Sequence, residues 1–314
     1  MKEGHVYIST GKLCKYFEVS RQAYYQHEWN QSKEVFQYGL ILEEIKAIRK
    51  RHPRIGGRKL QELLRPFMQI HGIKMGRDAL FDFLSIHGML IRTRKRCSKT
   101  THSCHWLKKY PNLIVDFIPS RPNELWVSDI TYWKIGDTTL YLSLITDAYS
   151  RKIVGEHLSE TLHAEETTKA LKMAISDLEK QPKTIEQLIH HSDRGVQYCS
   201  SSYINQLKKK NIRISMTQSG DPLDNAIAER INGIIKDEYL LNYQCDNIKD
   251  ARKRLAMAIS LYNTERPHSS IGNFTPEFVH NQYHQIEKEN IKKLWKNYYS
   301  KNYFCKLKTG LKNE

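Results

Sequence analysis

Three acidic side chains lie at positions where a carboxylate indicates a possible functional site. Asp129 sits in the middle of LWVSDITYW, which has the β-branched and aromatic composition of a strand. A carboxylate buried there needs a cation or a hydrogen-bond donor beside it. Asp193 ends the apolar run QLIHHSD, and open α/β sheets place ligand sites at the carboxyl ends of their strands. Glu229 lies on a predicted helix, DNAIAERINGIIKDEYL, further along the chain.

The helix that carries Glu229 has two distinct faces. Its apolar residues recur at helical spacing and are expected to face the core: Ile227, Ile231, Ile234 and Ile235. Its polar residues recur every three or four positions on another face: Asn225, Glu229, Asn232 and Lys236. Glu229 is therefore expected to point away from the packing stripe. Such a polar face is either solvated, or it holds a metal ion and a phosphate together.

Carboxylates from three separate elements suit one kind of chemistry. Mg²⁺ is a hard cation that prefers oxygen ligands in near-octahedral geometry. Two such ions about 3.5–4 Å apart can hold the attacking and the leaving oxygen of a phosphodiester. Two Asp and one Glu suffice, with water and phosphate oxygens completing the coordination. The sequence has neither a GxxxxGK[ST] loop nor a GxSxG elbow, so it indicates neither ATP chemistry nor a serine hydrolase.

Other acids compete for the same roles. Asp147 ends the strand-like segment TTLYLSLITD and more readily begins a turn. Asp221 precedes a proline and is typical of a turn, and Asp224 is a suitable helix N-cap. Asp237 and Glu238 stand beside Lys236 and can be solvated. Residue spacing alone leaves the choice among these carboxylates open.

Histidines and cysteines offer another metal site, which their spacing disfavours. His190 and His191 are adjacent, so in a strand their side chains face opposite sides of the sheet. We interpret them as hydrogen-bonded structural residues. The run CSKTTHSCH, residues 97–105, has the spacing of no common zinc site and is interpreted as part of a linker. The six cysteines form no CxxC pair, and a disulfide scaffold is not expected.

Positive charge is concentrated in two flanks of this chain of net charge +16. Residues 51–110 hold 14 Lys and Arg against 3 Asp and Glu, and residues 281–314 hold 8 against 3. Residues 111–280, between them, hold 20 against 22. Basic flanks favour binding to phosphate backbones, where counterion release drives association, over a merely soluble charged surface.

The N-terminal third is predicted to be helical. Residues 9–27 have the size of a helix-turn-helix, with Ser20 capping its second helix. Its apolar positions are Leu13, Tyr16 and Phe17. A second helical unit follows, with helices near 37–51, around Leu60–Phe67 and from Arg77, and it ends in the cluster RTRKR, residues 92–96. A DNA-binding module is favoured here over an ordinary helical domain with a charged tail.

The pattern changes after a polar segment with three prolines, residues 98–123, which is predicted to be a linker or wrapping segment. Three strand-like segments come next, and the residues IGD between the first two indicate a hairpin. A helix–strand–helix–strand–helix series follows. The fold class predicted is therefore α/β, a mixed sheet flanked by helices and preceded by all-α modules.

Several blocks in this order resemble a known family. LWVSDITYW, HHSDRGVQY and DNAIAERINGIIKDE resemble the three signature blocks of DDE transposases with a retroviral-integrase-like core. Thirty-five residues separate Asp193 from Glu229, which is the spacing of that superfamily. YNTERPHSSIGNFTPEFV, residues 262–279, resembles the family's YNxxRPH…TPxxF tail. The resemblance, over about residues 36–280, is to the OrfB-type transposases of frameshifting bacterial insertion sequences.

This resemblance implies a ribonuclease H-like fold in which Asp129, Asp193 and Glu229 are the catalytic metal ligands. The cofactor implied is Mg²⁺, as two ions, with Mn²⁺ able to substitute. The implied reaction cleaves insertion-sequence ends and joins the freed 3′-OH to target DNA by transesterification. Lys236 stands where the family carries a basic residue near the transposon end. The expected DNA-contacting residues are Lys236, Asn225, Arg194, Arg92, Arg94, Lys95, Arg96 and Arg266. A loop-structural role is the alternative for Arg194, and packing of the C-terminal helix onto the core is the alternative for Arg266, Tyr262, Asn263 and His268.

The partners expected are transposon-end DNA, target DNA and OrfA, or a frameshifted fusion to OrfA. A homo-oligomer on DNA is also expected. The sequence shows no sustained heptads of its own, no apolar run of about 18 residues and no signal-peptide core. We therefore expect a coiled coil to come from OrfA, no membrane contact, and a cytoplasmic, nucleoid-associated protein.

Five segments are predicted: a helix-turn-helix (1–35), a helical DNA-binding module (36–97), a linker (98–123), the catalytic core (124–280) and a basic tail (281–314). Two other functions compete with a transposase. One is a non-catalytic, domesticated helix-turn-helix DNA-binding protein, which would not need the three carboxylates. The other is a ribonuclease H-like nuclease without strand transfer, which the basic flanks and the RPH…TP block disfavour.

Overall fold

The computed structural model describes residues 9–91, 106–115, 117–180, 187–218, 225–241, 243, 245 and 247–285. The described chain divides into two compact units. The first contains the residues up to Arg51 together with Leu60–Leu90. The second contains His52–Lys59 and the residues from Ile91 onward. The short segment His52–Lys59 therefore belongs to the catalytic-core unit, although the sequence pattern placed it in a helical module.

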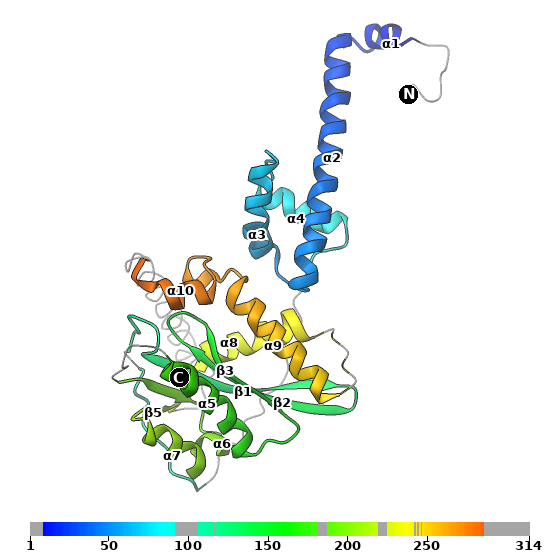
Figure 1. Ribbon diagram of the computed structural model, residues 1–314. Coiled ribbons are helices and arrows are strands. Elements are labelled where there is room, and N and C mark those ends of the chain that lie inside the picture. Colours follow the sequence, from blue (N-terminus) through cyan, green and yellow to red (C-terminus); the bar gives the residue numbers. More distant parts are fainter. Residues whose placement is uncertain are drawn as a thin grey trace, which may run out of the picture. The chain divides into compact units, whose positions relative to one another are not determined.

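The first unit is built on one long helix. Helix α1 (Thr10–Tyr16) is capped by Ser9, and Ser20 accepts a hydrogen bond from the amide of Ala23 at 3.0 Å, as expected of an N-cap. Helix α2 then runs without interruption through Arg21–Arg51, as Figure 1 shows. The boundary expected between residues 35 and 36 falls inside this helix. We correct it, because no turn residue interrupts the helical hydrogen bonding there.

Two shorter helices complete the first unit. Helices α3 (Gly57–Ile70) and α4 (Arg77–Ile86) lie where the sequence predicted them. The unit buries the apolar residues Ile41, Ile45, Ile48, Leu60, Leu64, Leu80 and Leu84. By contrast, Tyr16 is 80% exposed and Phe17 is 49% exposed, so the apolar face predicted for the first helix is not a core face. The helical character of this region is confirmed, and its helix-turn-helix function remains a prediction.

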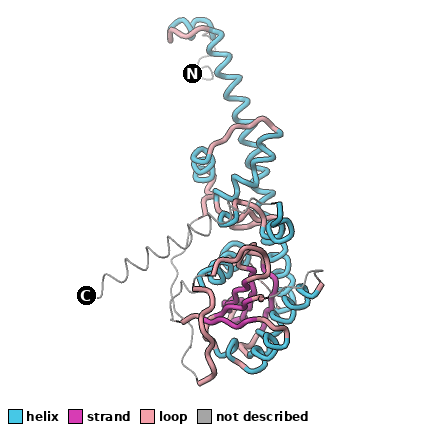
Figure 2. The backbone as a smooth tube through the Cα atoms, turned by 90° about the vertical axis from the view of Figure 1, so that its left-hand side faces the viewer, coloured by secondary structure: helices cyan, strands magenta, loops and turns pink. Residues whose placement is uncertain are grey.

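The second unit is organised around a five-stranded mixed sheet of order β3-β2-β1-β4-β5 (Figures 1 and 2). The strands are β1 (Leu125–Ile135), β2 (Thr138–Asp147), β3 (Ile153–Ser159), β4 (Ile189–Ser192) and β5 (Arg213–Met216). The first three pair antiparallel, and β4 and β5 extend the sheet in parallel from β1. Gly136, at φ +54°, forms the predicted β1–β2 hairpin turn. This topology confirms the ribonuclease H-like fold class.

Helices cover both faces of the sheet. On one face, α5 (Ala164–Glu179), α6 (Val196–Cys199) and α7 (Ser201–Lys209) pack on a core that includes Trp126 and Ile145. On the other face, α8 (Ala226–Ile234), the π-helical turn η2 (Ile235–Leu240) and α9 (Ile248–Thr264) pack on Leu142 and Leu144. The chain continues through η3 (Ser269–Ile271), α10 (Pro276–Gln282) and η4 (Tyr283–Gln285). Three layers of this kind bury both sides of the central strands.

The described part of the expected linker is packed rather than free. Leu107 and Tyr110 lie against the α5–α7 core, and Leu113 and Phe117 lie against a separate cluster that includes Val127 and Val279. The amide of Leu113 donates to the Oγ of Ser215, in β5, at 2.9 Å. This segment therefore wraps the edge of the sheet. In the described ranges, no helix has the length and apolar character needed to cross a membrane.

Candidate catalytic site

Asp129 lies in β1, at the centre of the sheet, with its half-buried side chain facing α8. Its Oδ1 accepts from the amide of Ile130 at 2.9 Å, and its Oδ2 accepts from Asn232 Nδ2 at 2.9 Å. Burial, with smaller contributions from the charges of Asp193 and Glu229, raises the pKa of the Asp129 carboxyl to about 7, against the lowering effect of the Asn232 and Ile130 hydrogen bonds. The carboxylates of Asp193 and Glu229 therefore both act on Asp129 from neighbouring elements.

Asp193 directly follows β4, which is parallel to β1 and hydrogen-bonded to it. Parallel pairing brings the carboxyl end of β4 to the middle of β1, where Asp129 lies. Asp193 Oδ1 accepts from the amide of Gly195 at 3.0 Å. A Cβ on Gly195 would lie 3.0 Å from that same oxygen, so glycine lets the backbone approach the carboxylate closely.

Glu229 lies in the first turn of α8 and its side chain is exposed. Two amides attach this helix to β1. Asn232, one turn after Glu229, donates to Asp129, and Asn225 Nδ2 donates to the backbone oxygen of Ser128 at 2.8 Å. Both amide side chains are buried. The polar face predicted for this helix is thus partly interior, and it fixes the helix to the strand that carries Asp129.

The three carboxylates are near one another but are not grouped about one point. Within the ranges that the structure describes, no three His, Cys, Asp or Glu side chains are close enough together to hold a single metal ion. Protein donors instead hold two of the carboxylates, since Asn232 binds Asp129 and the Gly195 amide binds Asp193. The donor set is all oxygen, which is the chemistry that a hard divalent cation prefers.

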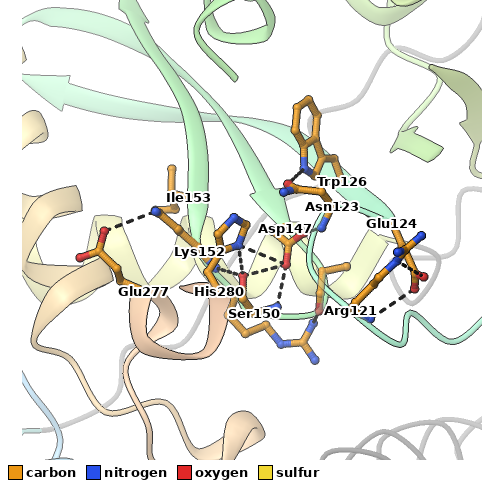
Figure 3. A network of polar contacts seen from close by, with 12 residues as sticks. Arg121, Asn123, Glu124, Trp126, Asp147, Ser150, Lys152, Ile153, Glu277 and His280 are labelled. Carbon is orange, nitrogen blue, oxygen red and sulfur yellow. Dashed lines mark hydrogen bonds and ion pairs between the residues drawn. The ribbon is translucent and has the colours of Figure 1, made fainter. Parts of the chain in front are cut away.

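Asp147, the main competitor for a catalytic role, is a structural residue (Figure 3). Its Oδ1 accepts from the amide and the hydroxyl of Ser150, both at 2.7 Å, and its Oδ2 accepts from the amide of Asn123 at 2.7 Å. Ser150 Oγ also lies 2.9 Å from His280 Nδ1 on α10. Asp147 therefore closes the turn after β2 and joins it to the start of β1, as the turn interpretation predicted.

Similarity to known proteins agrees with this geometry. Two models described as "Integrase core domain" match residues 119–222 and 210–276. An uncharacterised 31 kDa protein of insertion element IS600 from Shigella sonnei is 34% identical over 87% of this chain and 99% of its own length. The transposase InsF of insertion sequence IS3fB from Escherichia coli K12 is 34% identical over 63% of this chain and 68% of its own length.

The chain belongs to the IS3-type transposases of bacterial insertion sequences. Another relative, InsF of IS3A from Escherichia coli K12, is 29% identical over 88% of this transposase and 95% of its own length. Solved structures also match. The HTLV-2 integrase catalytic core in complex with magnesium matches at 24% identity and TM-score 0.41, over 51% of this chain and 97% of that one. A simian T-cell lymphotropic virus intasome chain matches at 20% identity and TM-score 0.45, over 72% and 70%.

The two adjacent histidines of the transposase are buried structural residues, as predicted. His190 Nε2 lies 2.7 Å from Ser128 Oγ and 2.9 Å from Tyr203 Oη. On the other face of the sheet, His191 Nδ1 lies 2.8 Å from Ser215 Oγ. Each ring is thus held by hydroxyl groups of neighbouring elements, and neither belongs to the carboxylate site.

Two of the expected DNA-contacting residues lie in the interior of the transposase. Arg266 is 0% exposed and makes a bidentate ion pair with Glu238, at 2.7 and 2.8 Å. Asn225 is buried against Ser128, as described above. Since DNA reaches surface side chains, we correct both DNA-contact expectations: Arg266 follows the packing alternative and stabilises the core, and Asn225 fixes α8. Tyr262, Asn263 and His268, from the same sequence block, are likewise buried.

The other expected DNA-contacting residues are partly exposed or lie outside the described residues. Lys236 is half-buried on η2, and Arg194 is half-buried next to Asp193. Arg92, Arg94, Lys95 and Arg96 lie outside the described ranges, as does the cysteine–histidine run at 97–105. The sequence placed Asn232 on the same helix face as Glu229 but did not identify it as the partner of Asp129. Its i, i+3 spacing from Glu229 was the available signal.

Proposed function

We propose that this transposase cleaves the ends of its insertion sequence and joins the freed 3′-OH to target DNA at divalent ions held by Asp129, Asp193 and Glu229. The observation that carries the proposal is geometric: β4, which Asp193 directly follows, pairs in parallel with β1, which carries Asp129, and Asn232 on the helix of Glu229 binds Asp129. Clustered carboxylates of this kind are unfavourable without a cation. Mg²⁺ is the favoured ion, as a pair, and Mn²⁺ would serve equally.

The protein's own part in this chemistry is to orient oxygens. When bound, the ions would supply positive charge for the attacking and leaving oxygens of a phosphodiester. The Asn232 amide and the Ile130 backbone amide fix the plane of the Asp129 carboxylate, and the Gly195 amide does the same for Asp193. Glu229 is exposed on a helix that two buried amides attach to β1. It can therefore turn toward a shared cation without repacking the core.

The reaction that we propose balances without a further cofactor. In cleavage, water forms a bond to phosphorus, the P–O3′ bond breaks, and a 3′-OH is left at the end of the element. In joining, that 3′ oxygen forms a P–O bond with the target backbone as another P–O bond breaks. One phosphodiester replaces another in the second step, and the proton lost by the attacking 3′-OH is balanced by protonation of the leaving 3′ oxygen of the target. No covalent protein–DNA intermediate is needed.

DNA contacts near the site would come from two half-buried cations. Arg194 immediately follows Asp193, and Lys236 lies one to two turns beyond Glu229 on the same helical segment. Both stand where a phosphate backbone would pass between the candidate carboxylates. The cluster at residues 92–96 adds four cations, and we propose that it binds backbone phosphates more remotely.

We also propose that the transposase acts with OrfA, or as a fusion to it, and as an oligomer on DNA. The first half of α2 supports a partner surface, because Trp29 is 79% exposed and Phe36 is 67% exposed. Large apolar side chains in such a stripe mark an interaction site more often than a solvated one. A strand-transfer assay on the element's own end DNA, with and without OrfA, tests this. Equal activity in both arms would contradict it.

The metal-ligand assignment is tested by Glu229→Gln and Asp193→Asn. Each change removes a charge with little change in shape, so end binding should persist while Mg²⁺-dependent cleavage falls by about a thousandfold or more. Calorimetric titration with Mn²⁺ should show weaker binding in both variants, which gives a readout independent of activity. Asp177→Asn, an exposed change on α5, is the matched control and should retain both properties.

The products of the same assay distinguish the reaction classes. Ends that are cleaved and joined to target DNA support a transposase mechanism. Ends that are cleaved but never joined, under conditions where OrfA is present, would identify a nuclease. Binding without any cleavage by the wild-type chain would identify a domesticated DNA-binding protein.

A further inference from the structure

The N-terminal half of α2 carries an exposed apolar stripe. Tyr25, Trp29 and Phe36 are all exposed, and at about 100° of rotation per residue they fall within about 40° of one another around the helix. The helix buries three isoleucines on its opposite side, Ile41, Ile45 and Ile48. Figure 1 shows this half of α2 extending beyond α3 and α4. The stripe is therefore separate from the face that builds the core of the first unit.

The stripe has the spacing of a coiled-coil seam. Written as heptads, residues 22–43 place Trp29 and Phe36 at a positions and Tyr25 at a d position. Ser32 and Gly39 fill the other d positions, so the pattern is short and is not a sustained apolar repeat. Gly39 is exposed, and a Cβ built there would meet nothing within 4 Å. A second helix could therefore approach closely along the seam.

The side chains beside the seam complement those of an identical helix. In a parallel pair, each g position of one helix faces the e position five residues later on the other. Glu28 would then face Lys33 of the second copy, and symmetry makes this contact twice. By the same rule Val35 would face Leu40. Both charged side chains are exposed, and Tyr24 Oη donates to Glu28 Oε1 at 2.5 Å, which orients that carboxylate on the helix surface.

Charge also decides the direction of the pairing. A two-fold axis across antiparallel helices keeps each flank of the seam on its own side. Glu28 and Lys33 lie on opposite flanks, so an antiparallel pair would keep them apart. Only the parallel arrangement brings these opposite charges together.

We propose that residues 22–43 of α2 join two copies of this chain as a short parallel coiled coil. The same patch serves both copies, so the chain's own sequence suffices to cover the stripe. Burial of the aromatic rings of both copies drives the association. Three heptads are short, so free chains are expected to pair weakly, and DNA that holds two chains strengthens the pairing.

This interface deepens the proposed function, because it names the surface of the proposed oligomer and rests on that proposal for its purpose. Parallel pairing puts the C-terminal ends of both α2 helices at the same end of the pair. Each chain continues from there, through His52, into its own catalytic-core unit. An insertion sequence has two ends, and such a pair offers one carboxylate site for each.

Charge reversal tests the pairing in the full chain, without DNA or metal ions. Self-association is measured by sedimentation equilibrium over a series of concentrations. Glu28→Lys and Lys33→Glu each turn two attractive contacts into two repulsive ones, so each variant should associate about tenfold more weakly than wild type. Mixed in equal amounts, the two variants should pair with each other about as well as wild type pairs with itself.

Matched substitutions separate the seam from the rest of the helix. Glu34→Lys makes the same reversal at an exposed position on the far side of α2 and should keep wild-type association. Trp29→Gln combined with Phe36→Gln removes the two largest exposed rings and should abolish association. All of these side chains are exposed, so the variants are expected to fold, and circular dichroism with thermal melting checks this.

An introduced cysteine reports the direction of the pairing. In a parallel pair the two copies of position 39 meet at the same level of the seam, whereas antiparallel pairing separates them. Gly39→Cys has room for its side chain and should form a disulfide between two copies under mild oxidation, which captures even a weak pair. Wild type oxidised in the same way controls for the natural cysteines.

A wild type that stays monomeric, with no cross-link in Gly39→Cys whether end DNA is absent or present, would overturn the interface. Equal association of the two charge variants mixed and apart would also overturn it. Binding of purified OrfA that depends on Trp29, in place of self-association, would assign the stripe to OrfA instead. Failure of the metal assignment is a separate result, because Asp129→Asn should associate like wild type, whereas the stripe variants should keep Mn²⁺ binding.

Discussion

At the scale of single residues, His190 shows how the core is kept neutral beneath the site. The ring is buried in β4 and is held by the hydroxyls of Ser128 and Tyr203. Burial, and then the neighbouring His191, lowers the pKa of His190 from 6.5 to about 3. The native protein therefore resists protonating this ring, while the unfolded chain accepts the proton near pH 6.5.

This difference predicts a pH dependence of stability. A histidine whose pKa is lower in the native protein than in the unfolded chain contributes its full stabilisation above the unfolded-state pKa. That stabilisation is lost as pH falls from about 6.5 toward 3. The loss approaches 1.4 kcal/mol per pH unit, about tenfold in the folding equilibrium. His190→Gln lacks this contribution, so the gap in unfolding free energy between wild type and variant should narrow between pH 7 and pH 4. Urea denaturation at several pH values measures it, and a constant gap would contradict the assignment.

Single residues also show how far a sequence can identify a site. Asp129 could be chosen as a candidate site residue, because an acid in the middle of a strand has a visible cost. Its partner Asn232 could not, because a helix face does not reveal which strand it will meet. For Arg266, the sequence could not decide between a DNA contact and packing onto the core. Only the position of Glu238, 28 residues earlier, makes its burial possible.

At the scale of elements, α2 differs most from expectation. Its N-terminal half contains Tyr25, Trp29 and Phe36, which are exposed, so this half contributes no buried core positions that would join it to the helix predicted near residues 37–51. The sequence therefore suggested two shorter helices with a boundary near residue 35. The structure has one helix over Arg21–Arg51, because nothing between them is a helix breaker.

A proline substitution tests the continuity of α2. Val35 is 65% exposed, so Val35→Pro removes no core contact but breaks a helical hydrogen bond, at a cost of about 3 kcal/mol. Amide hydrogen exchange in the flanking turns should accelerate by about a hundredfold, because a loss of about 3 kcal/mol raises the population of the locally open helix by roughly that factor. The matched control is Arg21→Pro at the first helical position, where proline is tolerated. Equal exchange rates in the wild type and Val35→Pro would contradict a continuous helix and would support the predicted boundary between residues 35 and 36.

The helix of Glu229 shows a second limit of sequence patterns. Apolar spacing correctly predicted the core positions Ile231, Ile234 and Ile235. It did not predict that the helix widens into a π turn at Ile235–Leu240, because such turns are rare and occur as single turns inside otherwise α-helical segments. That turn is what directs Glu238 and Tyr239 toward the segment His52–Lys59.

At the scale of the whole molecule, the excess positive charge and the sheet-containing core occupy different stretches of the chain. The sheet and its helices lie in a near-neutral stretch, whereas the basic flanks lie before and after it. The order of strands and helices in the core was predictable, because each element has a clear hydrophobic period. The five segments drawn from composition were less successful at residues 52–59, which packing places in the core unit. The described part of 98–123 packs on the core, in agreement with the wrapping alternative given for that segment.

Neutralising the cluster at residues 92–96 tests the role of the N-terminal flank. Changing Arg92, Arg94, Lys95 and Arg96 to Gln removes four charges, so the salt slope of duplex binding should fall by up to about 3.6. Binding measured between 50 and about 300 mM salt gives the slope. Lys208→Gln with Lys209→Gln, exposed changes at the end of α7, serve as the control. An unchanged slope in the fourfold variant would mean that the cluster contacts no phosphate.

The central claim is that Asp129 is a metal-binding carboxylate of the transposition reaction. Asp129→Asn keeps the shape of the side chain, so the variant should bind end DNA with near-normal affinity. Its Mg²⁺-dependent end cleavage should fall by at least about a thousandfold, equivalent to about 4 kcal/mol of transition-state stabilisation. The decisive measurement is single-turnover cleavage of labelled end DNA by wild type and Asp129→Asn at equal occupancy. Loss of cleavage with retained binding is the result predicted, and cleavage at the wild-type rate would contradict the account.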